Sequence, residues 1–337
     1  MAVHKNRVIP ALCRLGAACV AAIIALTGCT TYRAPGAESG PVHPLEGRIW
    51  SVREGAFIDY EDLAGRLLAS DHVLLGEIHI NPEHHRRQQR LIGEFTERDL
   101  QPAIVFEIFE RDRQADIDKA RTVSPPDPDQ IADAARLMDS GWDWPAYRPL
   151  VAQALREGLP IVAGNASGAD VRRVAMEGLD ALPDDRRELL QQATPLPAGA
   201  RAALMDTIVQ SHCGHVMGEM AGTLVDAQRL RDATMADAML SAGSGGSVLI
   251  AGSGHARRDY GAPFYLLDRN PTATLVSISF VEVSQGADDP AAYVQTGSDL
   301  QEPFDVLWFT ARTMTEDPCK QFRHSLKKLG QRSGQED

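Results

Sequence analysis

Short apolar runs alternate along the chain with longer stretches in which apolar residues recur at helical spacing. Four runs end in glycine or polar residues, as buried strands do, at 73–77, 103–109, 160–165 and 247–253. Three later runs predict further strands, at 264–268, 275–283 and 304–309. Between the runs we expect helices at 59–70, 82–98, 129–139, 145–157, 169–178, 184–193, 199–211 and 217–241.

This order of elements favours an α/β fold with a central, mostly parallel sheet flanked by helices. Parallel neighbours need long crossover connections, and the predicted helices supply them. The last three predicted strands have little helical sequence between them, so we expect an antiparallel edge there. We expect one domain over residues 45–312 and a loose polar tail over 313–337.

The chain begins with the pattern of an export signal. Three basic residues flank or precede an uncharged stretch, 15–28, which is too short to span a bilayer. It ends in the sequence LTGC, which resembles a bacterial lipobox. The resemblance implies that residues 1–28 are a signal peptide and that Cys29 carries lipid after cleavage. The alternative is an ordinary signal peptide followed by an incidental cysteine.

The segment after the lipobox predicts a tether and a location. Residues 29–44 are rich in proline, glycine and small residues, which is typical of a flexible linker. Residue 30 is threonine rather than aspartate, which by resemblance to sorted lipoproteins favours the outer membrane. We therefore expect a lipid-anchored domain that faces the periplasm, because a multi-chain lipid anchor holds a protein stably at a membrane.

Composition narrows the class of function. The formal net charge is −12, whereas a nucleic-acid-binding protein needs a basic face, so nucleic acid is excluded as a partner. Hydrophobic residues make up 44% of the chain, enough for a substantial core. With Cys29 lipidated, Cys213 and Cys319 can form at most one disulfide, and the sequence leaves that pairing open.

Polar residues stand at the ends of the four predicted buried strands. In open α/β sheets, ligands bind beyond the carboxyl ends of the strands. If the four strands are neighbours, these side chains converge on one pocket; they are Glu77 with His79, then Glu107, Asn165 and His255. A Glu-x-His pair such as Glu77 and His79 can hold a divalent ion or act as base and orienter. The alternative is that Glu77 only accepts hydrogen bonds from backbone amides.

A helix follows the first of these strands and carries further candidates. Asn81 and Pro82 are a typical helix start. His85 and Gln88 lie on one face of that helix, which we expect to point inward and support the pocket. His84 lies about 100° away, where we expect it to face solvent.

Three well-known catalytic patterns are absent from the sequence. The segment HHRRQ, 84–88, lacks the His-Glu-x-x-His zinc signature. The segment GSGHA, 252–256, is not a Gly-x-Ser-x-Gly nucleophile elbow. The glycines of 243–246 precede a strand, so they do not form a dinucleotide-binding fingerprint.

Six segments in one order resemble the ChaN-like haem-binding lipoproteins over about residues 45–285. They are LLGEIHINPEHHRRQ (74–88), VFEIFERDRQ (105–114), GWDWPAYRPLVAQALREGLPIVAGN (141–165), SHCG (211–214), DAQRLRDATMA (226–236) and IAGSGHARRDYGAP (250–263). The resemblance implies a haem-binding protein rather than an enzyme, acting in uptake or handling of haem iron at the outer membrane. An outer-membrane haem receptor and a second copy of this chain are the partners it suggests.

The same family resembles a wider group that includes TIKI-type metalloproteases and erythromycin-esterase-like hydrolases. In that group a Gly-Glu-x-His and a later Gly-x-x-His line the site, and here these are residues 76–79 and 252–255. The alternative function is therefore a metal-dependent or histidine-based hydrolase. It would use Glu77, His79, Glu107 and His255 around a divalent ion or a water, with Glu77, His79 and His255 as the metal ligands.

Haem requires an apolar slot, an axial iron ligand and cations for its propionates. The segment 211–220 contains His212, His215 and Met217 as possible ligands, although its histidines and methionines can instead fill a helix seam. The resemblance implies a tyrosine ligand, and Tyr147 and Tyr260 are the tyrosines within matched segments.

Basic and amide side chains in the matched segments complete the set of candidates. Arg257 can meet a propionate or lie on a solvated loop. Gln228 and Arg231 share the long predicted helix 217–241 and are expected to support the pocket. Arg231 either pairs with a carboxylate such as Glu77 or Glu107 or reaches an acidic group of the ligand.

Overall fold

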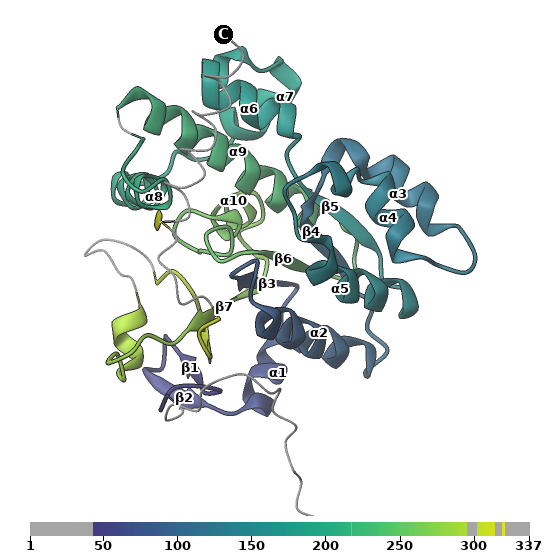
Figure 1. The fold of residues 1–337 in the computed structure, drawn as a ribbon, viewed down its shortest axis with the longest axis vertical. Helices are drawn as coiled ribbons and strands as arrows, with labels where there is room; N and C mark the ends of the chain where they lie inside the picture. The colour runs from purple at the N-terminus through teal and green to yellow at the C-terminus, as the bar shows by residue number, and fades with distance from the viewer. Residues whose placement is uncertain (1–42, 217, 295–301, 314–318, 321–337) are drawn as a thin grey trace, which may run out of the picture. The chain divides into compact units, whose positions relative to one another are not determined.

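The computed structural model describes residues 43–216, 218–294, 302–313 and 319–320 (Figure 1). The predicted signal peptide, the lipidation site Cys29, the candidate ligand Met217 and most of the predicted tail lie outside the described residues. Within the described part of the chain, no helix has both the length and the apolar character needed to cross a bilayer.

The elements alternate as the sequence predicts. In chain order they are β1 (Ile49–Ser51), β2 (Ala56–Ile58), α1 (Tyr60–Leu68), β3 (His72–Glu77), α2 (Pro82–Thr96), β4 (Ala103–Glu110), the 3₁₀ helix η1 (Arg111–Arg113), α3 (Gln114–Arg121), α4 (Pro128–Ala134), η2 (Leu137–Asp139), α5 (Trp144–Arg156), β5 (Ile161–Asn165), α6 (Gly168–Glu177), η3 (Leu179–Ala181), α7 (Asp184–Gln191), α8 (Ala198–Ser211), α9 (Glu219–Leu240), β6 (Ser247–Gly252), α10 (Ala262–Arg269), β7 (Leu275–Glu282), η4 (Pro290–Tyr293) and β8 (Val306–Thr310).

One eight-stranded sheet runs in the order β2-β1-β8-β7-β3-β6-β4-β5. Strands β3 to β8 pair in parallel, and β1 pairs antiparallel with both β8 and β2. The predicted mostly parallel α/β sheet with an antiparallel edge is therefore confirmed. The edge comes from a different part of the chain than expected, because β1 and β2 form it while β7 and β8 are parallel. Strands of three residues are too short to show a periodic signal.

Both faces of the sheet are covered by helices, which explains why the central strands β3 and β6 are buried throughout and largely apolar. Along β3 the side chains alternate between two cores: Val73 and Leu75 join the core under α1 to α5, whereas Leu74 joins the core under α6, α7, α9 and α10. The helices on the two sides are visible around the sheet in Figure 1. The chain thus buries the central strands on both faces and gathers polar residues at their carboxyl ends.

The expected strand at 264–268 is wrong. These residues lie in α10, which begins with Pro263 in its first turn and buries Tyr265 and Leu266 against the sheet. A five-residue apolar run does not distinguish a buried strand from the buried face of a short helix. The expected helix at 129–139 is also interrupted, because Arg136 adopts a left-handed conformation (φ 53°) between α4 and η2.

A substitution at Gly76 in β3 tests how tightly the strand ends are packed. A Cβ atom there would lie 2.9 Å from both Ala256 Cβ and the Ser253 backbone. We expect Gly76→Ala to lower the free energy of unfolding by about 1–3 kcal/mol, because overpacking forces backbone shifts. Urea denaturation measures the change. The control is Gly93→Ala in α2, which has open space around it and should raise stability by about 1 kcal/mol.

Candidate functional site

The carboxyl ends of β3, β6 and β4 lie side by side in the sheet, and the polar residues at these ends converge there. Six side chains from five segments form what we call the acid–histidine cluster: Glu77, His79, His85, Glu107, Asp232 and His255. The sequence predicts this convergence for the strand-end members, and the parallel register of β3 with β6 and of β6 with β4 produces it.

Glu77 is the centre of one half of the cluster. Its Oε1 lies 3.1 Å from His79 Nδ1 and accepts a short hydrogen bond from the Tyr147 hydroxyl. Its Oε2 accepts a 2.7 Å hydrogen bond from Gln88 Nε2 and lies 3.0 Å from His85 Nε2. Burial raises the pKa of this carboxyl, but the hydrogen bonds and charges of the two histidines outweigh burial and lower its pKa to about 2. Glu77 is therefore ionised, and its oxygens are committed to named partners.

Glu107 is the centre of the other half. Its Oε2 accepts a 2.7 Å hydrogen bond from the Gly252 backbone, and its Oε1 lies 3.2 Å from His255 Nε2. The other nitrogen of His255 lies 2.6 Å from Asp232 Oδ1. Burial lowers the pKa of His255, but the charges of Glu107 and Asp232 raise it to about 9. His255 is thus an imidazolium held between two buried carboxylates.

Asp232 is a member of the cluster that sequence reasoning did not select. It is fully buried on α9, and burial raises its pKa to about 6 despite the neighbouring His255 and Arg231. The available signal was its spacing, since Asp232 lies four residues after Gln228 and therefore on the same helix face. Gln228 Nε2 lies 3.0 Å from His255 Nδ1.

His79 is the member of the cluster that a ligand can reach. Its side chain is 41% exposed, whereas the other five members are at most 6% exposed. His79 Nδ1 lies 3.1 Å from Glu77 Oε1, and His79 Nε2 lies 4.0 Å from Glu107 Oε2. The Trp142 ring packs edge-on against the imidazole at 4.8 Å. The buried groups therefore orient one accessible imidazole.

The predicted supporting residues also lie around the cluster. Asn165 Nδ2 donates to the Glu107 carbonyl at 2.9 Å, and Arg231 Nε donates to Asn165 Oδ1 at 3.1 Å. Among the described residues, no ion pair joins Arg231 to Glu77 or Glu107, so the expected direct pairing is wrong. Arg231 instead lowers the pKa of Glu107 through its charge.

His84 is buried, contrary to the expectation that it faces solvent. Its Nδ1 accepts a hydrogen bond from the Ile78 backbone at 2.9 Å, and its Nε2 donates to Thr310 Oγ1 at 2.9 Å. Burial lowers its pKa to about 3, so it is neutral. The helix pattern did not reveal this role because β8, which covers the start of α2, lies more than 200 residues away in the chain.

A cleft of about 320 Å³ opens beside the cluster. His79 and the loop after β6 form one wall, and α8 forms the other with Leu204, Ile208 and Ser211. A second cavity of about 380 Å³ shares Tyr260 with this cleft and continues toward β7 and β8. Its aromatic lining comes from Phe280, Tyr293, Phe304 and Tyr260.

Tyr260 and Arg257 have structural partners at the border of the two cavities. The Tyr260 ring is buried, and its hydroxyl lies 3.2 Å from Thr207 Oγ1. Arg257 is buried rather than on a solvated loop; it pairs with Asp259 at 2.7 Å and lies 4.5 Å above the Tyr260 ring. The charge of Arg257 is therefore already matched by a carboxylate.

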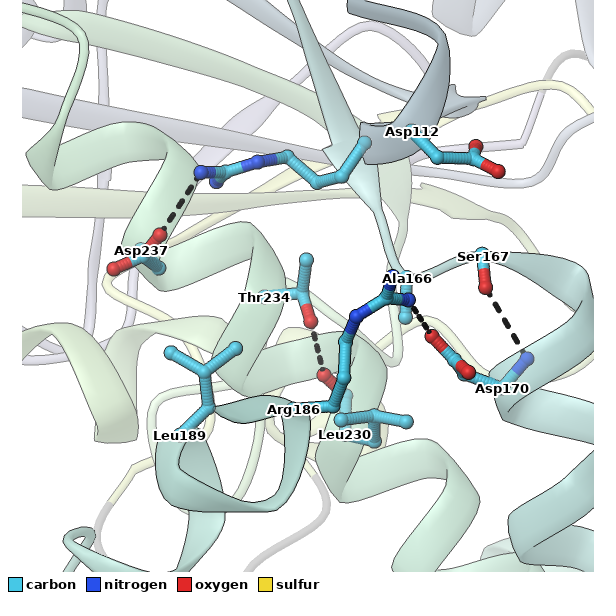
Figure 2. Close-up of a pocket in the computed structure, with 10 residues that line it drawn as sticks. Asp112, Ala166, Ser167, Asp170, Arg186, Leu189, Leu230, Thr234 and Asp237 are labelled. Carbon is cyan, nitrogen blue, oxygen red and sulfur yellow. Dashed lines mark hydrogen bonds and ion pairs between the residues drawn. The ribbon is translucent and has the colours of Figure 1, made fainter. Parts of the chain in front are cut away.

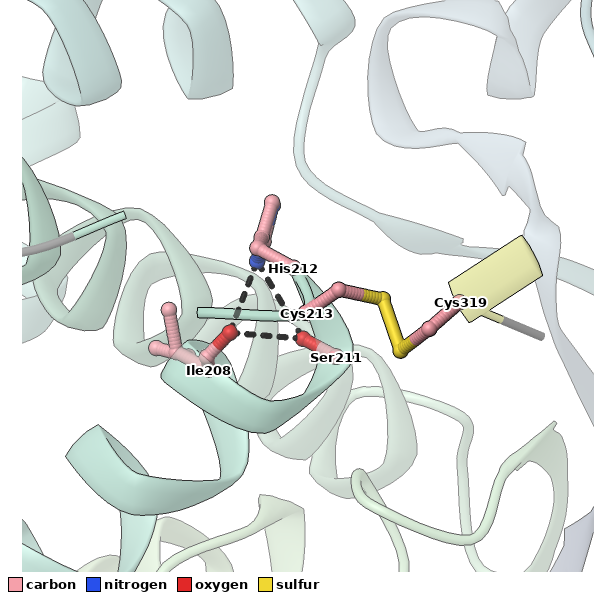
Figure 3. The surroundings of a disulfide bond; sticks show 5 residues. All are labelled: Ile208, Ser211, His212, Cys213 and Cys319. Carbon is pink, nitrogen blue, oxygen red and sulfur yellow. Dashed lines mark hydrogen bonds between the residues drawn. A yellow bond between two sulfur atoms is a disulfide. The ribbon is translucent and has the colours of Figure 1, made fainter. Parts of the chain in front are cut away.

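The α8–α9 corner, residues 211–220, adjoins the cleft through Ser211. Figure 3 shows Cys213 joined to Cys319 by a disulfide, which settles the pairing that the sequence left open (Cα–Cα 5.6 Å). His212 is half-buried, and its Nδ1 lies 2.8 Å from the Ile208 carbonyl. His215 is exposed at the surface of the corner. The disulfide attaches this corner to the segment that follows β8.

The residues proposed for a metal are not arranged as a metal site. In the described ranges, no group of three or more histidine, cysteine, aspartate or glutamate side chains is placed to hold an ion. His255 uses both ring nitrogens on carboxylates, and His79 uses one on Glu77. In this structure, Glu77, His79 and His255 therefore contact other members of the cluster.

Comparison with models of known protein families identifies the family of this chain. The family model described as "Haem-binding uptake, Tiki superfamily, ChaN" matches residues 63–266. The chain belongs to this family. The match includes all six members of the acid–histidine cluster and the α8–α9 corner. No curated protein sequence matches the chain.

The chain is similar to several solved structures, one of them with a TM-score above 0.5 among those described here. The ChaN protein of Campylobacter jejuni is 21% identical, with a TM-score of 0.62, over 77% of this chain and 95% of its own. Its structure is titled "Cofacial heme binding". The erythromycin esterase EreC is 14% identical with a TM-score of 0.38, over 78% of this chain and 82% of its own. The type III effector HopBA1 is 12% identical with a TM-score of 0.39, over 74% of this chain and 92% of its own.

His255 predicts a pH dependence of stability. Its folded-state pKa of about 9 lies above its ordinary value of 6.5, so the folded protein holds this proton more tightly. The resulting stabilisation is complete below pH 6.5 and is lost as the pH rises through about 9. We expect the free energy of unfolding in urea to fall over this range, and to fall less steeply in His255→Gln. An equally steep fall with pH in the wild type and in His255→Gln would contradict a protonated His255 between Glu107 and Asp232.

Proposed function

We propose that this protein binds haem in the cleft beside the acid–histidine cluster, at the α8–α9 corner. Membership of the ChaN haem-binding family supports this, as does the fold shared with a ChaN protein whose structure is titled for cofacial haem binding. The structure adds a specific candidate for the iron ligand.

The orientation of His212 carries the proposal. Its Nδ1–H donates to the Ile208 carbonyl at 2.8 Å, which places the lone pair of the ring on Nε2. Histidines that ligate metals usually donate their other ring N–H to a carbonyl or carboxylate in this way, because that bond sets the tautomer and orients the ring. The disulfide at Cys213, the next residue, fixes the backbone of the same corner.

The cleft and the second cavity have the apolar surface that a porphyrin needs. Leu204 and Ile208 of α8 pack with Tyr260 in one cluster beside the cleft, and the aromatic lining of the second cavity extends that surface toward β7 and β8. Haem bound there would supply the iron chemistry, while His212 holds the iron and the apolar walls exclude water. Tyr260 is the tyrosine candidate that reaches this space; Tyr147 is buried against Glu77.

The N-terminal sequence supports a cellular location that is consistent with haem binding. The lipobox at Cys29 and the threonine that follows it favour a lipid-anchored protein at the outer membrane, facing the periplasm. There it would take part in uptake or handling of haem iron, with a haem receptor or a second copy of this chain as partner.

Titration with haemin tests the proposal. We expect the purified full-length chain to give a saturable Soret shift and His212→Ala to weaken haemin binding by about 10–100-fold, through loss of the iron ligand. His215→Ala, at the same corner, is the matched control and should keep most of the affinity. Tyr260→Phe tests the tyrosine candidate with little change in shape.

Each outcome of that titration has a distinct meaning. Absence of a saturable shift would exclude haem binding by this chain. A shift that survives both histidine substitutions would exclude His212 and His215 as the source of the ligand, and its loss in Tyr260→Phe alone would transfer ligation to the tyrosine.

A second candidate function is histidine-based hydrolysis, favoured by the accessible and oriented His79. The Glu77 carboxylate accepts from Nδ1–H, so Nε2 is the basic nitrogen and can take a proton from a water or hydroxyl in the cleft. A general base must be accessible to the substrate, and within the acid–histidine cluster the His79 ring is the exposed one. The arrangement fits a metal-free hydrolase better than a metalloprotease, given the contacts of the described cluster.

The hydrolase candidate is tested with a simple chromogenic ester such as p-nitrophenyl acetate. If His79 is a general base, His79→Asn should lower the rate by about 10²–10⁴-fold, while His212→Ala leaves the rate unchanged. Equal rates for the wild type and His79→Asn would exclude this function. Stoichiometric zinc or manganese in the purified protein would instead support the metal-dependent alternative.

A further inference from the structure

The cavity beyond β4 and β5, drawn in Figure 2, is lined by charged groups that pair with one another. Arg111 lies 3.0 Å from Asp237 Oδ2, and Arg186 is paired with Asp170. The described residues that line it do not line the cleft beside the acid–histidine cluster. Its charges are matched within the protein, and it is separate from the candidate site.

The second cavity, of about 380 Å³, adjoins that cleft directly. Its volume is within the range of small-molecule sites, which is about 300–1,000 Å³. The cavity and the cleft have these lining residues in common: Ile78, Thr207, Ser253, Gly254 and Tyr260. A ligand in the second cavity can therefore extend to His79, which lines the cleft.

One wall of the second cavity carries hydroxyl groups without partners. Ser279 of β7 is 4% exposed, and its hydroxyl retains accessible surface but has no hydrogen-bond partner among the described residues. The Ser253 hydroxyl lines the same cavity and likewise has no partner in the described part of the chain. The two serines are close together, because Ser279 pairs with Gly76 in the sheet and a Cβ atom on Gly76 would lie 2.9 Å from Ser253 Cα. Buried hydroxyl groups are almost always hydrogen-bonded, so this wall favours a ligand with an oxygen acceptor.

The loop after β6 connects this polar wall to His79. The amides on either side of Gly254 donate to backbone carbonyls at 2.9 Å, whereas the Gly254 amide has no acceptor among the described residues. The His79 ring lies against the end of β6, since a Cβ atom on Gly252 would be 2.9 Å from its Cε1 and 3.0 Å from its Nε2. Unused hydrogen-bond donors and the accessible imidazole are therefore found together where the cleft and the second cavity adjoin.

The rest of the lining is mainly apolar and carries balanced charges. Its charged members are Arg257, which pairs with Asp259, and Glu282, which accepts a 2.8 Å hydrogen bond from Asn81 Nδ2. Because an ion would have to leave water for a space without a net charge, the lining favours a neutral ligand. The apolar members come from β7, β8 and the segments between them: Val281, Ala292, Tyr293, Phe304 and Leu307.

We propose that the second cavity is the acyl site of an ester hydrolase and binds the hydrocarbon chain of a neutral carboxylic ester. The carbonyl oxygen of the ester lies on the polar wall formed by Ser253, Gly254 and Ser279, beside His79. This inference rests on the hydrolase candidate above and names its substrate class. An acyl chain and a porphyrin are alternative occupants of the apolar part of this space.

The reaction needs only the ester and a water. His79 Nε2 takes a proton from the water, whose oxygen attacks the carbonyl carbon of the ester. The carbonyl oxygen becomes an oxyanion, which the Gly254 amide and the two serine hydroxyls stabilise by hydrogen bonds. The bond from the carbonyl carbon to the alcohol oxygen then breaks, and that oxygen takes the proton from the His79 imidazolium. The products are the carboxylic acid and the alcohol.

A chain-length series of p-nitrophenyl esters tests the acyl site in the purified full-length chain. We expect kcat/KM to rise at least about tenfold from the acetate to the hexanoate, because the added methylene groups leave water in the cavity. Ala292→Trp, on the exposed rim of the cavity, should remove this rise by filling the space. Ala291→Trp is the matched control and should keep the rise, because Ala291 is exposed on the same 3₁₀ helix η4 but is not among the described lining residues.

A second variant, Ser279→Ala, tests the polar wall without adding bulk. It removes one donor to the oxyanion and should lower kcat/KM for the hexanoate at least about tenfold. Thermal unfolding of each variant shows whether it is folded.

The outcomes separate the acyl site from the function on which it rests. If neither ester is turned over faster than by His79→Asn, the hydrolase function itself is excluded, and the acyl site with it. Turnover that depends on His79 but does not rise from the acetate to the hexanoate would overturn the acyl site alone. The same holds for a rate and a chain-length dependence that both Ala292→Trp and Ser279→Ala leave unchanged.

Discussion

The structure around the strand ends depends on the pairing of buried carboxylates with imidazoles. Glu77 ends β3 and Glu107 lies within β4, and both carboxyl groups are buried. An unpaired ionised carboxylate at such a position would cost several kcal/mol, a large part of a protein's net stability. His79 and His85 lie 3.1 Å and 3.0 Å from Glu77, and the His255 imidazolium lies 3.2 Å from Glu107. Tyr147 and Gln88 saturate the remaining lone pairs of Glu77. The cluster is therefore a network in which removal of one member leaves another buried and unpaired.

This network also separates the roles of its members. The groups that are fully engaged, such as His255 between two carboxylates, keep the strand ends in register and are closed to a ligand. His79 alone in the cluster combines a fixed orientation with an exposed ring. At the α8–α9 corner, which adjoins the cleft through Ser211, His212 contacts the Ile208 carbonyl and Cys213 is held by the disulfide.

Sequence reasoning was most successful where the physics is local. The apolar runs of β3 to β6 are readable because strands buried on both faces must be continuous in apolar residues. The start of α2 at Asn81 and Pro82 is readable because capping depends on neighbouring residues. It failed at β1 and β2, which are too short for periodicity, and at α10, where five apolar residues suit either a strand or a helix. Asp232 was passed over because its role depends on a histidine 23 residues further along the chain.

By itself, then, the sequence determined the fold class, the polar strand ends and the set of side chains available to a site, because these follow from residue type and spacing along the chain. The tertiary structure decided which of them meet. It placed Tyr147 on Glu77, buried His84 under β8, matched the charge of Arg257 with Asp259, and joined Cys213 to Cys319. Partners that are distant in the chain are chosen by strand order and helix packing, and a spacing pattern carries no information about either.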